Sequence, residues 1–182
     1  MGKIFNYDSK FFAGMTKVSD TIIINILFVI CSIPIVTIGA SITALYSVSM
    51  KITRDEDIYA AKEFIKQFKQ NFKQSTIIWI ILLVIGLFIG LDFYLCSLMS
   101  DNTISMIFKF IFTIVSVVLA FILIYVFPLT ARFENSIKNT LTNSIFMSIQ
   151  HLPYTLVMSV LAFAPIVSFI LFSQYWGQIV FF

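Results

Sequence analysis

The chain has 182 residues, of which 59% are hydrophobic and 12% are charged, whereas an ordinary soluble domain carries about 25% charged residues. This composition excludes a water-soluble fold, because so much apolar surface could not all be buried in a core. The formal net charge of +3 is too small and too scattered for a surface that binds nucleic acid. The sequence therefore predicts a protein whose surroundings are the lipid bilayer, with no nucleic-acid partner.

Four apolar stretches divide the chain, and each reaches or exceeds the roughly 20 residues that a helix needs to cross a membrane. They cover about residues 21–50, 75–99, 104–128 and 153–182. Segments of this length fit helices rather than strands. The sequence thus predicts an all-α, polytopic membrane protein with four to five transmembrane segments, built as a single domain over residues 1–182.

The first apolar stretch, at 21–50, would measure about 45 Å as one straight helix, and it is interrupted by Pro34, Thr37 and Gly39. Proline removes a backbone donor and glycine permits tight turning or close packing, so we expect a helix break there. Two arrangements remain open, one kinked crossing or a broken hairpin. Three lysines before residue 18 favour the hairpin, since basic segments stay inside. The break is either a packing feature or an unwound, transporter-type binding element.

Basic residues are distributed unevenly between the loops. Residues 51–74 carry six lysines and arginines, residues 130–152 carry Arg132 and Lys138, and the turn at 100–103 carries none. By the positive-inside rule the two basic loops are cytoplasmic and the turn is outside. We therefore expect a multi-pass protein of the cell membrane, in which the second and third apolar stretches form an outward-facing hairpin.

Both basic loops contain an amphipathic helical pattern. In the first loop Phe64, Phe68 and Phe72 recur at helical spacing while lysines take the other face, and the pattern leads directly into the second apolar stretch. In the second loop Phe133 begins a weaker repeat of apolar residues spaced by four. We expect two cytoplasmic amphipathic helices, whose phenylalanines either anchor the chain at the membrane surface or contact a partner.

Residues that carry chemistry are few. The sequence has one histidine, His151, and it lacks a phosphate-binding loop, a recognisable metal-ligand spacing and a nucleophile paired with a base. We therefore expect neither an enzyme nor a bound cofactor or metal. Cys31 and Cys96 lie in apolar runs and are expected to be small core residues rather than a disulfide.

Two charged residues lie inside apolar stretches, where a charge is costly unless it is paired or hydrated. Asp92 and Lys109 are almost equally distant from the turn at 100–103, so an antiparallel hairpin would bring them to a similar depth. We expect a structural ion pair in which Lys109 reaches toward the interface. The alternative is a substrate or proton site, which requires both side chains to face a wet cavity.

Two blocks of sequence resemble a known family. The first block runs Ser-Ile-Pro-Ile-Val-Thr-Ile-Gly-Ala at residues 32–40, followed by Ala44-Leu45-Tyr46 and by Phe64-x-x-x-Phe68-x-x-Asn71-Phe72-Lys73. The second block runs Phe-Pro-Leu-x-Ala-Arg-Phe-Glu at residues 127–134, followed by His151-Leu152-Pro153. In this order and at this separation the blocks resemble the YesL family, also called the DUF624 domain, from about Asn25 to Ala162.

The resemblance implies an integral membrane protein of a Gram-positive bacterium with unassigned activity. Genes of this family often lie beside genes for carbohydrate ABC transporters and glycoside hydrolases. The resemblance implies no catalytic or binding residue. It adds weight to Arg132, Phe133 and Glu134 as a contact element, because two charges flank a hydrophobic anchor.

The leading functional prediction is a non-enzymatic accessory or regulatory component of carbohydrate (ABC-type) uptake, which contacts the transporter through its amphipathic helices. The main alternative is a small solute permease acting as a dimer, with the helix break and the two intramembrane charges around its pathway. A structural or sensory membrane component without a sugar connection is a third prediction. The sequence leaves open the ligand, the partner and the oligomeric state, a homo-oligomer included.

Overall fold

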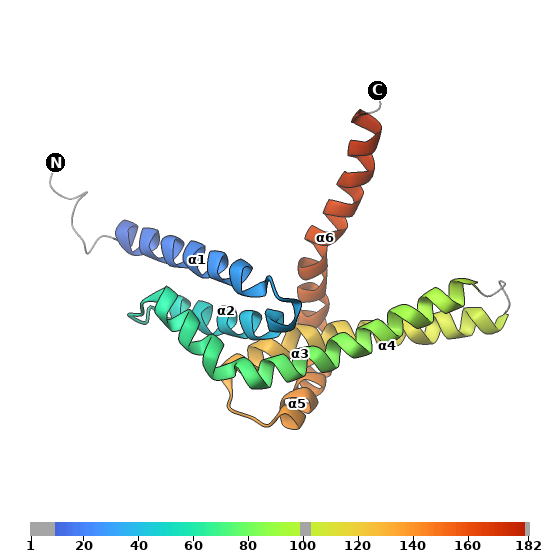
Figure 1. Cartoon of the computed structure of the whole chain (residues 1–182), viewed down its shortest axis with the longest axis horizontal. Helices are drawn as coiled ribbons and strands as arrows, with labels where there is room; N and C mark the ends of the chain where they lie inside the picture. The colour runs from blue at the N-terminus through green and yellow to red at the C-terminus, as the bar shows by residue number, and fades with distance from the viewer. Residues whose placement is uncertain (1–9, 99–102, 181–182) are drawn as a thin grey trace.

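The computed structural model of the chain describes residues 10–98 and 103–180, and the regular elements in these ranges are helices (Figure 1). In chain order they are α1 (Lys10–Ser32), the short 3₁₀ turn η1 (Ile35–Thr37), α2 (Ile38–Thr53), α3 (Ala60–Leu98), α4 (Thr103–Arg132), α5 (Ile137–Gln150) and α6 (Leu152–Val180). Of the predicted outer turn at 100–103, only Thr103 belongs to the described residues.

Four segments of the described chain are long and apolar enough to cross a membrane. They are Gly14–Ser32, Ile35–Thr53, Ala60–Leu98 and Thr103–Arg132. A fifth span results if α5 and the beginning of α6, which meet at a bend of 103°, are counted together. The chain is therefore an all-α, multi-pass membrane protein, and the predicted number of four to five spans is confirmed.

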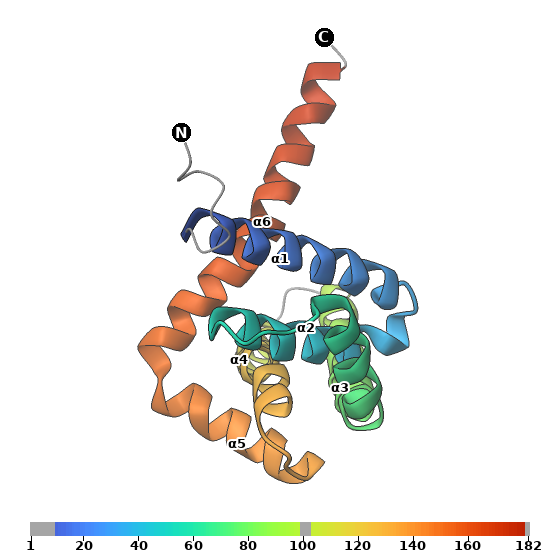
Figure 2. The same ribbon diagram turned by 90° about the vertical axis from the view of Figure 1, so that its left-hand side faces the viewer.

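The first apolar stretch forms a broken hairpin rather than one kinked crossing. Figures 1 and 2 show α1 and α2 side by side, running in opposite directions. Their apolar segments, Gly14–Ser32 and Ile35–Thr53, have 19 residues each. A helix of this length measures about 28 Å, close to the thickness of a bilayer's hydrocarbon core.

Pro34 marks the break between the two helices of this hairpin. Its backbone is extended, with φ −75° and ψ 120°, and its nitrogen has no hydrogen to donate. The hydroxyl of Thr37 lies 2.6 Å from the carbonyl oxygen of Cys31 and 2.8 Å from that of Pro34. The indole N–H of Trp79, on α3, donates to the carbonyl oxygen of Ile35 at 2.8 Å. These carbonyl groups thus find donors within the chain, as irregular backbone at membrane depth requires.

The long helix α3 joins the first amphipathic pattern to the second apolar stretch in one helix of 39 residues, as predicted. Its length of about 58 Å is almost twice the hydrocarbon thickness of a bilayer. Figure 1 shows that its first turns run at an angle to the remainder. The polar first turns and the later apolar segment therefore belong to one bent helix.

The two parts of α3 pack against different neighbours. Its first part packs against α1 and α2, α2 also crosses it at Ser75 and Trp79, and its outer part pairs with α4, where the rings of Phe93 and Phe112 are 6.1 Å apart. Figure 1 shows the α1–α2 hairpin and the outer part of the α3–α4 hairpin extending in opposite directions from the middle of the molecule. The α1–α2 hairpin therefore does not lie beside the whole length of the α3–α4 hairpin.

Two buried clusters hold these helices together. The first joins α1, α2 and α3 and consists of Ile24, Ala44, Val48, Ile52, Ala60 and Phe64. The second joins α3 and α4 and consists of Ile78, Leu82, Val126 and Phe127. Long rows of isoleucine, valine, leucine and phenylalanine on the outer sides of α1, α3 and α4 are exposed, as expected for helices that face lipid.

The second amphipathic helix differs from its prediction. Phe133 lies in a linker before α5, which begins at Ile137 after the capping residue Ser136. The residues that α5 buries fully are Thr140, Ser144 and Ser148, while Ile137 and Leu141 of the predicted apolar row pack partly buried against the α3–α4 cluster. Small side chains let α5 approach α4 closely, and hydroxyl groups can be buried at such a contact because they donate to carbonyl oxygens of their own helix.

Candidate functional site

Gly39 lies at a close crossing of α2 and α3. A Cβ atom added at this position would stand 2.5 Å from the Cβ atom of Trp79 and 2.7 Å from the carbonyl oxygen of Ser75, far inside ordinary contact distance. The ring of Phe127, on α4, would be 3.2 Å away. Three helices therefore meet at this glycine, and its missing side chain permits their contact.

A buried pair of hydroxyl groups continues the contact one turn further along α2. The hydroxyl of Ser75 donates to Oγ1 of Thr43 at 2.8 Å, and Thr43 in turn donates to the carbonyl oxygen of Gly39 at 2.9 Å. Both side chains are fully buried. This pair fixes the register of α2 on α3, because a slip would leave a buried polar group without its partner.

These contacts favour the packing interpretation of the helix break over the transporter-type binding element. A binding element needs backbone groups that face a wet cavity. In this structure the carbonyl groups of Cys31, Pro34 and Ile35 have donors from Thr37 and from α3. The glycine that follows is covered by α3 and α4.

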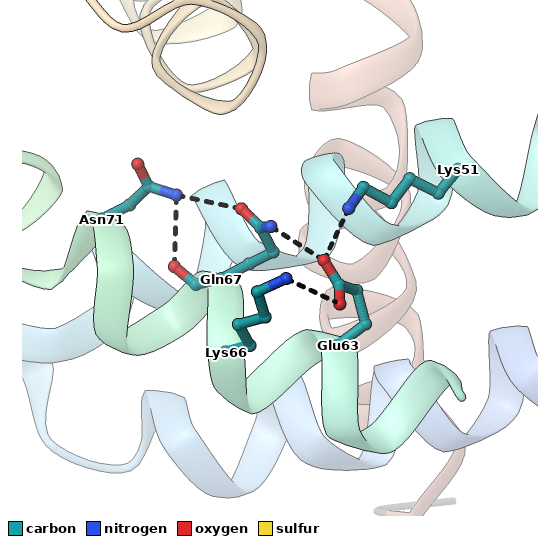
Figure 3. A network of polar contacts seen from close by, with 5 residues as sticks. All are labelled: Lys51, Glu63, Lys66, Gln67 and Asn71. Carbon is teal, nitrogen blue, oxygen red and sulfur yellow. Dashed lines mark hydrogen bonds and ion pairs between the residues drawn. The ribbon is translucent and has the colours of Figure 1, made fainter. Parts of the chain in front are cut away.

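A charged network lies at the opposite end of α2, beside the polar turns of α3 (Figure 3). One carboxylate oxygen of Glu63 accepts hydrogen bonds from Nζ of Lys51 at 2.5 Å and from Nε2 of Gln67 at 2.9 Å, and the other lies 3.7 Å from Nζ of Lys66. Asn71 extends the network by donating to Gln67. The Glu63 side chain is 14% exposed and that of Lys66 is 67% exposed. The contact between Glu63 and Lys51 therefore links α2 to α3, while Lys66 remains a surface charge.

This link was not predicted from the sequence. Lys51 was counted only among the six basic residues of the loop at 51–74. A signal was present, because Glu63 is the only acidic residue between positions 60 and 74. A single acid in a strongly basic helix is a candidate partner for a base elsewhere, here Lys51 at the end of α2.

A second ion pair joins the start of α1 to the loop after α2. Nζ of Lys17 lies 2.6 Å from the carboxylate of Asp55, with side chains that are 42% and 73% exposed. The pair borders an open hollow of about 260 Å³, which is also lined by Asp20, Glu56 and Asp57. Because both partners are exposed, the pair contributes little to stability. The pair joins the N-terminal part of α1 to the loop that follows the C-terminal end of α2.

Hydrogen bonds from Lys51 and Gln67 hold the pKa of Glu63 below its ordinary value. Burial acts in the opposite direction and is outweighed by these contacts. Glu63 lies in the polar turns of α3, outside the apolar segment that begins at Ser75. Its negative charge is therefore part of the folded structure at neutral pH.

As the pH is lowered, the wild-type protein should lose stability more steeply than a variant that lacks the Glu63 carboxylate. A carboxyl group whose pKa is lower in the folded than in the unfolded state stabilises the fold above the unfolded-state value, and this contribution is lost as the pH falls through the folded-state value. The unfolding temperature of Glu63→Gln in detergent should therefore change less than that of the wild type below about pH 5. Glu56→Gln, which removes an exposed carboxylate, should retain the wild-type pH dependence. Identical pH profiles for Glu63→Gln and the wild type would contradict this role.

Among the ion pairs that join described residues, none links Asp92 to Lys109 as predicted. The ion pairs between described residues lie at the charged end of the α1–α2 hairpin, around Asp55 and Glu63. Asp92 and Lys109 are each half-buried on the α3–α4 hairpin. The prediction assumed that this hairpin is symmetric about its turn.

The register of the α3–α4 hairpin explains the difference. The rings of Phe93 and Phe112 pack together, so Lys109, three residues before Phe112, is level with Cys96, three residues after Phe93. Asp92 lies four residues before Cys96. That distance is about one helical turn, or 6 Å along the axis, so the two charges are at different depths.

The predicted contact phenylalanines of α3 fall into different environments. Phe64 is fully buried against α1 and α2, which corrects the prediction that it contacts a partner. Phe68 packs partly against the same cluster. Phe72 contacts the ring of Phe68 and is 39% exposed. Only the last of the three therefore offers a substantial surface to lipid or to another protein.

The predicted contact residues at 132–134 are exposed and held in place. Nε2 of Gln74 donates to the carbonyl oxygen of Asn135 at 2.8 Å, which fastens the linker before α5 to α3. The guanidinium carbon of Arg132 lies 5.4 Å from the centre of the Phe133 ring, a cation–π distance. Arg132, Phe133 and Glu134 are all exposed. They form an ordered group in which Phe133 follows a basic residue and precedes an acidic one.

Comparison with known proteins gives one match. The sequence model of the family described as "Protein of unknown function, DUF624" matches residues 21–93, a segment that includes the Gly39 crossing and the Glu63 network. No curated protein and no solved structure matches the chain. The second block of the resemblance, at 127–153, lies beyond the matched residues. The DUF624 model therefore matches the part of the chain that contains the first block of the resemblance, and membership of the YesL family is consistent with that match.

Proposed function

We propose that this protein is a non-enzymatic accessory component of carbohydrate uptake that contacts an ABC-type transporter in the same membrane. The link to carbohydrate uptake rests on the resemblance to the YesL family, whose genes often accompany those of such transporters. The site of contact rests on one observation, an exposed aromatic ring held beside α3 at the end of a membrane-spanning helix. That ring belongs to Phe133.

Phe133 has the properties of an interface anchor. The residue is 47% exposed, and aromatic residues, phenylalanine included, are enriched in protein interfaces together with arginine. Its backbone N–H donates to the carbonyl oxygen of Leu129 at 2.9 Å, and the carbonyl oxygen of Phe133 accepts from Asn135 at 3.1 Å. A segment that is already ordered loses little conformational entropy on binding. Because these bonds order the linker before a partner binds, they support it as the site of contact.

Phe72 belongs to a different surface. Gln74 faces the linker before α5. Phe72 comes two residues earlier, and a separation of two residues turns the side chain by about 200° around the helix. Phe72 therefore points away from the linker that Gln74 holds. We place the partner contact at residues 132–134 alone, and not across both predicted amphipathic helices.

The proposed contact lies on the cytoplasmic side of the cell membrane of a Gram-positive bacterium. The six basic residues at 51–74, together with Arg132 and Lys138, support this side through the positive-inside rule. The bacterial class comes from the family resemblance. On this side the contact would meet the cytoplasmic parts of a transporter.

The alternative, a small permease acting as a dimer, has less support. A permease needs polar groups that face a continuous pathway. The carbonyl groups of Cys31, Pro34 and Ile35 at the helix break are bonded within the chain. Asp92 and Lys109 lie at different depths on the hairpin. These contacts favour an accessory role over transport by the chain itself.

Crosslinking in the native membrane, followed by purification of the full chain in mild detergent, should recover transporter subunits in near-equal amounts. Phe133→Glu should lower this recovery about tenfold or more, because a charge replaces the ring that anchors the contact. Quantitative mass spectrometry of the purified material measures the recovery.

Tyr59→Glu is the matched control. Tyr59 is an aromatic residue, 86% exposed, in the loop before α3 on the same proposed side of the membrane. This variant should retain the transporter subunits. Full recovery with Phe133→Glu, or purification of the chain with its own copies alone, would overturn the proposal. In the second case, solute uptake by the purified protein in liposomes would test the permease alternative.

A further inference from the structure

Four lysines form one stripe along the first turns of α3. Lys62, Lys66, Lys69 and Lys73 are separated by steps of four, three and four positions. This spacing keeps them within a sector of about 60° around the helix and spreads them over about 16 Å of its length. All four side chains are exposed. We call this group the lysine stripe.

The lysine stripe lies on the side of α3 that faces away from the rest of the molecule. Phe64 and Ser75, both fully buried, mark the side that meets α1 and α2. They lie about 200° and 220° around the helix from Lys62. Within residues 10–98 and 103–180, the stripe is therefore a helix face without a neighbouring helix.

Little negative charge opposes the stripe. Glu63 is the only acidic residue between positions 60 and 74, and its close contact is with Lys51, while Lys66 is at 3.7 Å. Asp57, at the end of the preceding loop, lines an open hollow together with Lys62 and Lys66. Two carboxylates, one of them already paired, do not neutralise four ammonium groups. An anionic surface would relieve the repulsion between these groups.

An exposed apolar edge runs beside the stripe. Ile65 is 45% and Phe72 is 39% exposed, and both lie on the same flank of the lysines around the helix. The stripe ends at Lys73, two positions before Ser75, where the apolar part of α3 begins. A row of lysines beside apolar side chains is typical of a helix in the membrane interface, where ammonium groups meet phosphates and apolar groups insert beneath them.

We infer that the lysine stripe binds the headgroups of anionic phospholipids in the leaflet that this end of the molecule faces. The bend in α3 (Figure 1) turns its first part out of the direction of the apolar segment, so the stripe can lie along the membrane surface. Each lysine near an anionic leaflet contributes about fivefold to binding. The stripe is separate from residues 132–134, so this inference does not depend on the proposed transporter contact.

The test measures the reactivity of individual lysines in the full chain. The purified protein is placed in nanodiscs of phosphatidylcholine alone, or of phosphatidylcholine mixed with phosphatidylglycerol. The rate of acetylation by an amine-reactive ester is then followed for each lysine by mass spectrometry. Phosphatidylglycerol should slow the labelling of Lys69 and Lys73 about fivefold or more, because its phosphates bind the ammonium groups and shield them from the ester. Lys138, exposed on α5 and outside the stripe, should change little.

Paired variants separate charge from structure. Lys69→Gln combined with Lys73→Gln should lower the apparent affinity for a fluorescent short-chain phosphatidylglycerol in detergent about 25-fold. Lys69→Arg combined with Lys73→Arg should bind like the wild type, because both charges remain.

Three results would overturn the inference. The first is an equal labelling rate in both kinds of nanodisc. The second is an equal slowing of Lys138, which would indicate a general surface potential instead of a defined stripe. The third is protection that appears in native membranes but in neither nanodisc, which would assign the stripe to an acidic protein partner.

Discussion

Gly39→Ala should lower the unfolding temperature of the purified protein strongly. The new methyl group would stand 2.5 Å from the Cβ atom of Trp79 and 2.7 Å from the carbonyl oxygen of Ser75. Neither atom can rotate out of the way, so α2 and α3 must move apart. This movement also strains the hydrogen bond between Ser75 and Thr43. Overpacking costs about 1–3 kcal/mol, and loss of a buried hydrogen bond adds roughly 1 kcal/mol.

Thermal unfolding in detergent, followed by intrinsic fluorescence, measures this effect. Gly90→Ala is the matched control, because Gly90 also lies in a membrane-spanning helix and a Cβ atom there would meet nothing within 4 Å. Alanine is the better helix former by up to about 1 kcal/mol, so this variant should be as stable as the wild type or slightly more stable. Wild-type stability of Gly39→Ala would contradict the close crossing of α2 and α3.

The break in the first apolar stretch could be predicted because its causes are local. Pro34 and Gly39 act on their own backbone, and basic residues near the ends of the stretch favoured a hairpin. The residues that cover Gly39 could not be predicted, since Ser75 and Trp79 belong to another helix. In a membrane protein the apolar signal is the same for a side chain that faces lipid and one that faces a helix. Ile22 and Ile24 illustrate this, with 54% and 0% exposure.

The register of paired helices also could not be predicted from the sequence pattern. A hairpin with a short turn predicts that Asp92 and Lys109 come to a similar depth, but packing of Phe93 against Phe112 offsets them by one turn. Buried hydroxyl groups of α5 likewise carry no apolar signal, so the periodicity of large side chains did not show that Thr140, Ser144 and Ser148 share the buried face with Ile137 and Leu141. The segments that could be predicted are those fixed by length, charge and proline. The contacts that could not be predicted depend on how one helix surface fits another.

The phenylalanines of α3 show the same limit within one helix. The amphipathic pattern treats Phe64 and Phe72 as one face, yet each step of four residues turns the side chain by about 40°. Over two steps the face drifts by about 80°, so Phe64 points into the first cluster while Phe72 reaches its edge. Their burial therefore differs, and their substitutions should have different effects.

Phe64→Ala should destabilise the protein by about 3–5 kcal/mol, the usual cost of removing a buried phenylalanine. Its side chain is fully buried among residues of α1 and α2, so its loss leaves a cavity at the junction of three helices. Phe72→Ala, at the exposed edge of the same helix, should cost about 1 kcal/mol or less. Thermal unfolding of both variants in one detergent measures the difference. Equal losses would mean that both rings belong to the core, and an unaffected Phe64→Ala would mean that α1 and α2 do not pack on the first turns of α3.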